Sequence, residues 1–331
     1  MSRFRMSKKA NIAVVSVIAL AFLLVIVLHE NQFANPQDEL IKKCIAGTII
    51  VVSILLYIVL YDKITVLPAE LYQNRKLIWK LAKNDFKTRY AGSYLGMVWA
   101  FVQPIVTILV YWFVFEKGFN AKAEMLANGL TAPYVLWLTA GIVPWFYFSE
   151  ALSNGTTALL EYNYLVKKVV FKISILPIIK IIAATFIHGF FVLFMLGLFM
   201  VHGYFPDLYT LQLFYYSFCL FVFVLGISYA TCSIVIFFRD LTQIIAIFLQ
   251  VGMWATPILW ELNKIPPKYQ ILFKLNPVFY IVNGYRSALL EKSWFWEDFY
   301  STMFFWIVTA VIFGIGALIF KRLKVHFADV L

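Results

Sequence analysis

Apolar stretches about as long as a membrane is thick recur along the whole 331-residue chain. A helix needs about 20 such residues to cross a bilayer, and within lipid it pairs all of its own backbone groups. The sequence therefore predicts an all-α polytopic membrane protein with about eight transmembrane helices. The predicted spans are Ile12–Leu28, Cys44–Tyr61, Tyr94–Phe115, Pro133–Leu152, Ile173–Val201, Leu211–Phe238, Leu241–Leu259 and Phe299–Phe320.

The composition excludes a soluble fold. Hydrophobic residues make up 63% of the chain, charged residues only 14%, and the mean hydropathy is +0.83. A soluble protein of this length cannot bury so much apolar surface. Aromatic residues, at 19%, suit lipid-facing spans and membrane interfaces and also suit a path for sugars.

Basic residues gather on one side of the predicted membrane. Of the 28 Lys and Arg residues, 19 fall on the side of the N terminus. The other 9 fall on the opposite side, where 10 acidic residues offset their charge. Because Lys and Arg are retained in the cytoplasm, we expect a multi-pass protein of the cytoplasmic membrane with both termini cytoplasmic. The net charge of +11 then reflects orientation and contact with anionic membrane lipids, and no nucleic-acid partner is expected.

A predicted amphipathic helix precedes the third span, over residues 71–92. Its lysines fall on one face and its apolar residues on the opposite face, an arrangement typical of a helix that lies in the membrane interface. The basic face holds Lys76, Lys80, Lys83 and Lys87, and the apolar face holds Leu71, Ile78, Leu81, Ala82 and Phe86.

Between the last two spans, residues 260–298 contain two apolar stretches too short to cross a membrane. They are Tyr269–Leu275 and Val278–Leu290, separated by Pro266-Pro267 and Asn276-Pro277. We interpret them as re-entrant or surface-lying helices at the outer mouth. A folded external loop that packs on its own spans is the alternative.

The chain lacks the usual signatures of nucleotide or metal chemistry. No GxxxxGK[ST] loop occurs, so ATP cannot be bound in the P-loop manner. The three cysteines and four histidines show no metal-ligand spacing, and no metal or catalytic residue is predicted. Ionisable candidates within the spans are Glu150, Lys180 and His188; the first two lie near span ends, from which they can reach the interface.

Four ordered motifs resemble one family. Asp85–Tyr90 is followed by Gly92-Ser93-Tyr94-Leu95-Gly96, Trp99 and Gln103-Pro104; then come Leu165–Phe171 with Ile175-Leu176-Pro177, Phe238-Arg239-Asp240, and Leu275-Asn276-Pro277 leading to Gly284-Tyr285-Arg286. Together they resemble the permease subunits of type-2 ABC exporters, in particular those for O-antigen, capsule or teichoic acid polymers. The resemblance covers about residues 75–331. It implies two extra spans in residues 1–70 and an exporter domain of six spans in residues 93–331.

The resemblance also implies partners and roles. ATP and Mg²⁺ would be held by an ABC ATPase subunit, present in two copies, and this chain would pair with a second copy of itself. The segment Glu161–Lys172 would be the cytoplasmic coupling helix, and the external helix pair about residues 260–298 would close the exit. The coupling residues would be Tyr162, Tyr164, Lys167, Lys168 and Phe171, and the external gate would include Asn276, Pro277, Tyr285 and Arg286. Lys172 stands where family members usually carry proline, so the end of the coupling helix is expected to differ.

Two spans carry polar and aromatic stripes that are candidates for a substrate path. Gln243, Gln250 and Trp254 recur on one face of the seventh span, and amides or an indole facing lipid would be costly. In the third span the candidates are Trp99, Gln103, Thr107 and Trp112. The alternative for both stripes is helix–helix packing.

The sequence therefore favours the transmembrane subunit of an ABC exporter that moves a lipid-linked polysaccharide. An exporter of a drug or small lipid would have the same fold. A membrane-embedded glycan-processing enzyme or assembly protein is the other alternative, and it would need an acidic catalytic cluster; the nearest approach is Glu297-Asp298.

Overall fold

Helices form nearly all of the secondary structure in the computed structural model, which describes residues 8–28, 36–89, 94, 96–119, 124–125, 131–167 and 172–330. Within these ranges the strands are β1 (Glu124–Met125) and β2 (Thr131–Ala132), which form one short antiparallel pair. The all-α prediction is confirmed. Contacts divide the chain into two units, Met1–Arg75 and Lys76–Leu331.

The first unit is built on a helical pair, α1 (Lys8–Leu28) and α2 (Pro36–Val59), followed by the short α3 (Tyr61–Ile64). The start of α1 is tied to α3, because the Lys8 ammonium lies 2.6 Å from a carboxylate oxygen of Asp62 and Asn11 donates to the Tyr61 hydroxyl at 3.2 Å. Most large apolar side chains of α1 and α2 remain exposed, as expected of helices that face lipid.

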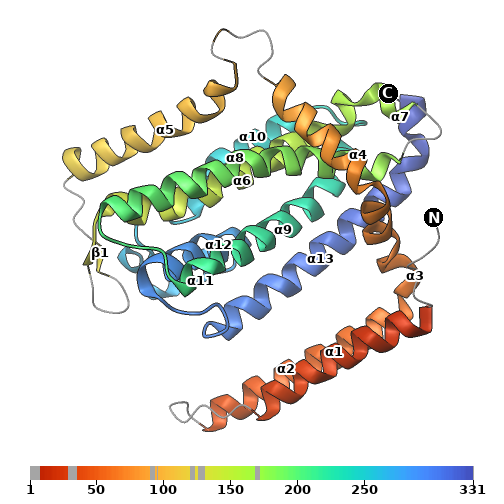
Figure 1. Cartoon of the computed structure of the whole chain (residues 1–331), viewed down its shortest axis with the longest axis horizontal. Helices are drawn as coiled ribbons and strands as arrows, with labels where there is room; N and C mark the ends of the chain where they lie inside the picture. The colour runs from red at the N-terminus through yellow and green to blue at the C-terminus, as the bar shows by residue number, and fades with distance from the viewer. Residues whose placement is uncertain are drawn as a thin grey trace. The chain divides into compact units, whose positions relative to one another are not determined.

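The second unit has a core of four long helices, α6 (Tyr134–Glu161), α8 (Leu176–Val201), α9 (Gln212–Ile234) and α13 (Phe299–Leu323). Figure 1 shows them running nearly parallel or antiparallel, with α6 beside α8 and α9 beside α13. The α9–α13 contact depends on two glycines: a Cβ on Gly316 would lie 2.2 Å from the Gly226 carbonyl oxygen. Small residues allow such close approach between membrane helices.

Seven helices are long and apolar enough to cross a membrane, counted over the described residues. Besides α1, α2 and the four core helices, they include α5 (Trp99–Trp112), which continues as a π-helix over Phe113–Gly118. These seven correspond to seven of the predicted spans.

The remaining predicted span, Leu241–Leu259, is shorter than expected. Helix α10 (Leu241–Ala255) has 15 residues, hence a length of about 22 Å, less than the hydrocarbon thickness of about 30 Å. Pro257 disfavours helical geometry at Thr256, whose backbone is extended. The apolar sequence extends past the end of the helix because Ile258 and Leu259 are buried against the rest of the unit. The predicted span therefore included apolar residues that are not helical.

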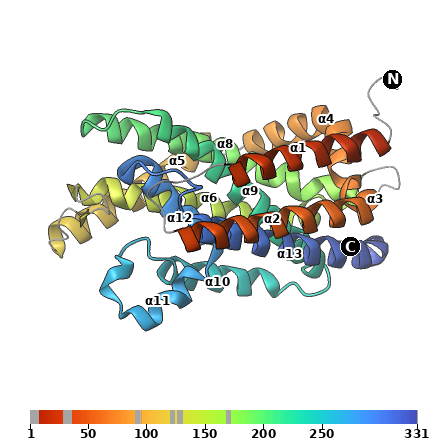
Figure 2. The ribbon, with the colours of Figure 1, turned by 90° about the horizontal axis from the view of Figure 1, so that it is seen from below.

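The two predicted external helices are present as α11 (Pro267–Lys274) and α12 (Pro277–Arg286), and the latter continues as a π-helix over Ser287–Glu291. Both begin at proline, which favours the first turn of a helix. Helix α11 and the β pair lie at one end of the second unit, whereas α7 (Asn163–Val166) and the C-terminal α14 (Phe327–Val330) lie at the other (Figures 1 and 2).

The interface helix is α4 (Val66–Thr88), which begins five residues before the predicted start at residue 71 and ends four before the predicted end at 92. The two expected faces are present. Lys76, Lys80, Lys83 and Lys87 are exposed, while Ile78 and Ala82 are buried.

Site-directed labelling tests the orientation. In a chain with Cys44 replaced by alanine, a cysteine at Asp207 should react with an impermeant maleimide from outside, because this residue lies at the α11 end. Cysteines at Lys83 and Lys167 should react only after permeabilisation. Cys219 and Cys232 are buried and should contribute little background. External labelling at Lys167 would contradict the topology.

Candidate functional site

A carboxylate lies on the buried face of the interface helix. Asp85 is only 8% exposed. It lies on the same face of α4 as Ile78 and Ala82, and this face packs against the rest of the second unit. An isolated charge in such a place would be strongly destabilising, so its partners decide what it does.

The partner of Asp85 is the ammonium group of Lys180, in the first turns of α8. The Lys180 Nζ lies 2.6 Å from Asp85 Oδ1 and also 2.6 Å from Glu161 Oε2, at the end of α6. The Tyr162 hydroxyl donates to Asp85 Oδ1 at 2.8 Å. Four groups from α4, α6 and α8 and from the start of the α6–α7 connection therefore meet at one point.

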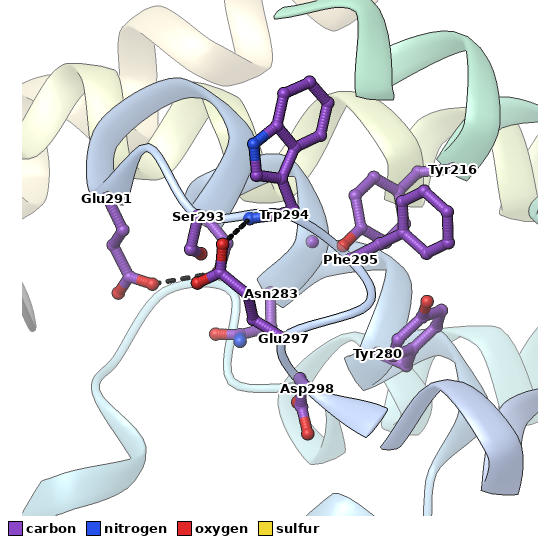
Figure 3. A pocket seen from close by; sticks show the side chains of 11 residues that line it. Tyr216, Tyr280, Asn283, Glu291, Ser293, Trp294, Phe295, Glu297 and Asp298 are labelled. Atoms are coloured by element: carbon purple, nitrogen blue, oxygen red, sulfur yellow. Dashed lines mark hydrogen bonds between the residues drawn. The ribbon is translucent and has the colours of Figure 1, made fainter. Parts of the chain in front are cut away.

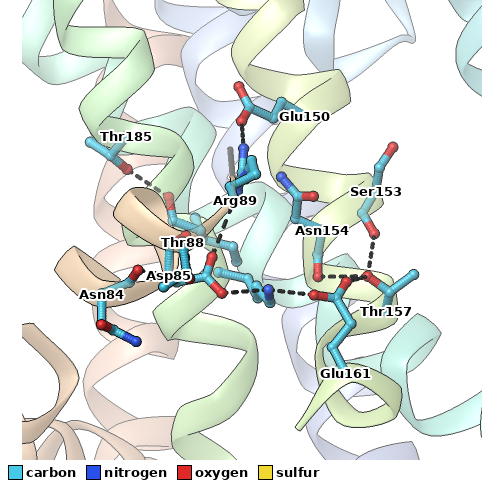
Figure 4. A network of polar contacts seen from close by, with 12 residues as sticks. Asn84, Asp85, Thr88, Arg89, Glu150, Ser153, Asn154, Thr157, Glu161 and Thr185 are labelled. Atoms are coloured by element: carbon cyan, nitrogen blue, oxygen red, sulfur yellow. Dashed lines mark hydrogen bonds and ion pairs between the residues drawn. The ribbon is translucent and has the colours of Figure 1, made fainter. Parts of the chain in front are cut away.

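A second ion pair extends this cluster. Arg89, just past the end of α4, pairs with Glu150 of α6 and lies 3.7 Å from Asp85 Oδ2 (Figure 4). We call Asp85, Arg89, Glu150, Glu161, Tyr162 and Lys180 the ionic cluster. It ties the interface helix to the core helices at the α7 end of the unit.

The ionic cluster corrects one sequence expectation. Glu150 and Lys180 were expected to reach the membrane interface from span ends, but both instead form ion pairs, and Lys180 is only 6% exposed. The available signal was Asp85 itself, an acidic residue placed on an otherwise apolar helix face. Its partners Tyr162 and Lys180 are 77 and 95 residues away, so spacing along the chain could not identify them.

The predicted coupling residues divide into two groups. Tyr164 is 55% exposed and Lys167 is exposed, whereas Val166 of the same short helix α7 is buried and holds it in place. Tyr162 points inward to Asp85, with the Lys180 ammonium 5.0 Å from its ring centre. Lys168 and Phe171 lie outside the described residues.

The α10 stripe is exposed. Gln243, Gln250 and Trp254 face away from the chain, while Ile245 and Leu249 on the opposite side are buried. Gly252 lies against Trp145 of α6, close enough that an added Cβ would come within 3.0 Å of the indole. Packing within this chain therefore does not explain the polar stripe.

The stripe of α5 is less uniform. Trp99 and Gln103 are exposed, but the Thr107 hydroxyl donates to the Gln103 carbonyl of its own helix at 2.9 Å. The Trp112 indole donates to Glu116 at 2.6 Å. Trp99 and Gln103 are thus open to a neighbour, whereas Thr107 and Trp112 have local hydrogen bonds.

The predicted external gate residues hold α12 in the unit. The buried Arg286 donates to the carbonyls of Pro257 and Ile258, both at 2.8 Å, and its guanidinium lies 3.4 Å from the centre of the Trp137 ring. Asn276 caps α12, beginning at Pro277, and donates to Thr256 Oγ1 at 2.7 Å.

Tyr285 is also buried, against the membrane-length helices α8 and α9. Its hydroxyl lies 2.7 Å from Ser217 Oγ of α9 and 3.0 Å from His188 Nε2 of α8. His188 is thus a hydrogen-bonded group joining three helices. Among the residues that the structure describes, no group of three or more His, Cys, Asp or Glu side chains could hold a metal ion.

Seven membrane-length helices, an amphipathic helix bound to them through an ionic cluster, and the short helices α11 and α12 together define a polytopic membrane protein within the described residues. Residues 76–290 match the family described as ABC-2 type transporter, and the chain belongs to that family. This confirms the resemblance carried by the four motifs. The match begins after α1 and α2.

Characterised relatives are similar over most of the chain. It is 28% identical over 267 residues to the O-antigen export system permease protein RfbA of Myxococcus xanthus, which covers 80% of this chain and 98% of that protein. A protein of the same name from Klebsiella pneumoniae is 25% identical, over 77% of this chain and 95% of its own length. The polysialic acid transport protein KpsM of Escherichia coli is 24% identical, over 62% and 78% respectively.

Removing the ammonium group of the ionic cluster tests its contribution to stability. Lys180→Met leaves Asp85 buried without its main partner, and breaking a buried pair costs about 3–5 kcal/mol. The melting temperature of the purified protein should fall clearly. Asp85→Asn combined with Lys180→Met should recover part of the loss, because the buried Asp85 charge is then removed and Glu161 is exposed to water.

Lys83→Met is the matched control, since Lys83 is exposed on the same interface helix. Equal melting temperatures for Lys180→Met and Lys83→Met would show that the cluster does not stabilise the fold.

Proposed function

We propose that this chain is the transmembrane subunit of an ATP-driven exporter that moves a lipid-linked polysaccharide of the O-antigen, capsule or teichoic acid type across the cytoplasmic membrane. Membership of the ABC-2 type transporter family and the printed functions of the relatives support the proposal. The protein is multi-pass, with both termini in the cytoplasm.

The observation that carries the proposal is the exposed stripe of α10. Two amides and an indole on an otherwise apolar membrane helix need a neighbour other than lipid, and the described part of the chain leaves all three side chains exposed. Indole faces stack on sugar rings, and amides hydrogen-bond with hydroxyl groups. The side chains of Gln243, Gln250 and Trp254, together with exposed Trp99 and Gln103 of α5, line the path in this proposal.

A homodimer encloses this path. One copy leaves α10 and much of α5 uncovered, and a two-fold axis beside them would bring two identical stripes together around a channel. Exposed apolar residues that flank the stripe, such as Ile244 and Val251, would contact the second copy or lipid.

Power comes from a separate ABC ATPase, two copies per dimer, which holds ATP and Mg²⁺. Exposed Tyr164 and Lys167 on α7 contact the ATPase, and Lys168 and Phe171 belong to the same segment. Movement of α7 reaches the interface helix through Glu161 and Tyr162, whose contacts with Lys180 and Asp85 join the two elements. The ionic cluster transmits the motion because Asp85 and Lys180 are buried and Glu161 and Tyr162 bond to them directly.

This chain is a permease subunit and not an enzyme. The acidic pair suggested for a glycan-processing alternative, Glu297 and Asp298, is engaged in ordering the backbone: Glu297 accepts from the Trp294 amide at 3.1 Å and Asp298 from the Ser301 amide at 3.4 Å. An exporter of a drug or small lipid remains the second candidate, favoured by family membership alone.

Deletion of the gene tests the proposed cargo. Cells without the protein should accumulate lipid-linked polysaccharide inside and lose it from the surface, and the intact gene should restore export. Normal surface polysaccharide combined with loss of drug or lipid efflux would favour the second candidate.

Trp254→Ala tests the path. The indole is 55% exposed and packs little within the chain, so the melting temperature should stay near that of the unmodified protein. Loss of one stacking platform, worth roughly 1–3 kcal/mol by analogy with base–aromatic stacking, should slow export and raise intracellular precursor.

Phe248→Ala serves as the control, because Phe248 is 58% exposed on α10 but lies off the stripe. A destabilised Trp254→Ala protein that exports normally per folded molecule would assign the stripe to packing between copies.

Coupling is tested by Tyr164→Ala with Lys167→Ala. The double variant should insert normally but lose ATPase binding and export, since aromatic and cationic side chains are frequent interface anchors. Tyr269→Ala, at the other end of the unit on exposed α11, is the control. Normal ATPase co-purification and export by the double variant would refute the assignment.

A further inference from the structure

A cavity of about 340 Å³ lies beside α12, at the end of the second unit opposite α7. Its walls come from α9, from α12 with the π-helix that follows, and from the connection to α13. It shares no lining residue with the stripes of α5 and α10. Its volume falls at the lower end of the range for small-molecule sites.

The cavity has an aromatic side and an acidic side. Figure 3 shows the rings of Tyr216, Phe295 and Tyr280 on one side, facing Glu291 and Glu297 on the other. Gly284 makes the aromatic side possible, because a Cβ there would lie 2.1 Å from the Tyr216 ring.

The connection that forms one wall is held rigidly by a buried amide. Gln212 of α9 is 3% exposed; it donates to the Ser293 carbonyl at 2.8 Å and accepts from the Phe295 amide at 2.7 Å. The Phe295 ring also stacks on Tyr215, with ring centres 4.0 Å apart. A site held in this way loses little entropy when a ligand binds.

The polar groups in the cavity are not fully used by the protein. Within the described part of the chain, the side-chain amide of Asn283 makes no hydrogen bond, and Glu297 and Asp298 each engage one carboxylate oxygen in a backbone contact. Three carboxylates line the cavity and no Lys or Arg does.

The adjacent lysine is held by another acid. Lys292 forms an ion pair with Asp207 at 2.8 Å. Partial burial opposes the shift, but the hydrogen bond and charge of Lys292 lower the pKa of Asp207, so Asp207 stays ionised at neutral pH. Lys292 is therefore engaged by Asp207.

We propose that this cavity is a binding site for an amino sugar unit, with its ammonium group at Glu297, its hydroxyl groups at Asn283, and its apolar face toward the aromatic side. Carboxylates attract the cation, and aromatic rings favour a neighbouring ammonium group as well as apolar carbon. Neutral sugars bind more weakly and anionic sugars are excluded. The site is separate from the proposed path and faces outward in the proposed topology.

Ligand-observed NMR on the full chain in lipid nanodiscs, without the ATPase, tests the site. Glucosamine should bind at least about tenfold more tightly than glucose or N-acetylglucosamine at neutral pH, because only glucosamine carries the ammonium group. Glucuronic acid should not bind. Since no transport is required, failure of binding and failure of the proposed export function are separate results.

Glu297→Gln should remove most of the preference for glucosamine, and Asn283→Ala should weaken glucosamine and glucose alike. Glu261→Gln, a carboxylate outside the cavity, is the control. Equal binding of glucosamine and glucuronic acid, displacement of glucosamine by ethanolamine at equal affinity, or unchanged preference in a folded Glu297→Gln variant would overturn the proposal.

Discussion

A charged group that is buried within a membrane protein needs a partner of opposite charge inside the protein. In the described structure, the buried pair Asp85 and Lys180 meets this requirement. Neither group is near enough to water to be solvated, so each requires the other. Because the two residues belong to α4 and α8, their pairing fixes the interface helix on the core. Glu161 and Tyr162 then bring the start of the α7 connection to the same point.

A second set of buried polar contacts joins helices at the opposite end of the second unit. Arg286 binds the backbone carbonyls of Pro257 and Ile258, in the segment that follows α10, and Tyr285 hydrogen-bonds with α8 and α9. Helix α12 is thus held by a guanidinium and a phenol rather than by apolar packing alone. If α11 and α12 form an external gate, opening it by moving α12 away from the other helices would break these hydrogen bonds.

These two polar centres place the proposed functions in separate regions. The ionic cluster joins α7, the proposed contact with the ATPase, to the interface helix. The exposed stripe of α10 lies on the proposed path, and the cavity beside α12 shares no lining residue with that stripe. The proposed energy input, transport and external recognition therefore use different side chains of the same helical unit. Residues 1–75 form a unit of their own and lie outside the family match.

Hydropathy and charge along the sequence by themselves determined the helical class, seven of the spans, the two faces of α4 and the external helix pair, because these depend on local length and periodicity. The motifs indicated the family. Only the tertiary structure decided that Asp85 pairs with Lys180, that Arg286 binds the carbonyls of Pro257 and Ile258 after α10, and that Tyr162 points inward while Tyr164 points out. Those contacts join residues far apart in the chain, and their energies depend on burial, which no spacing along a sequence records.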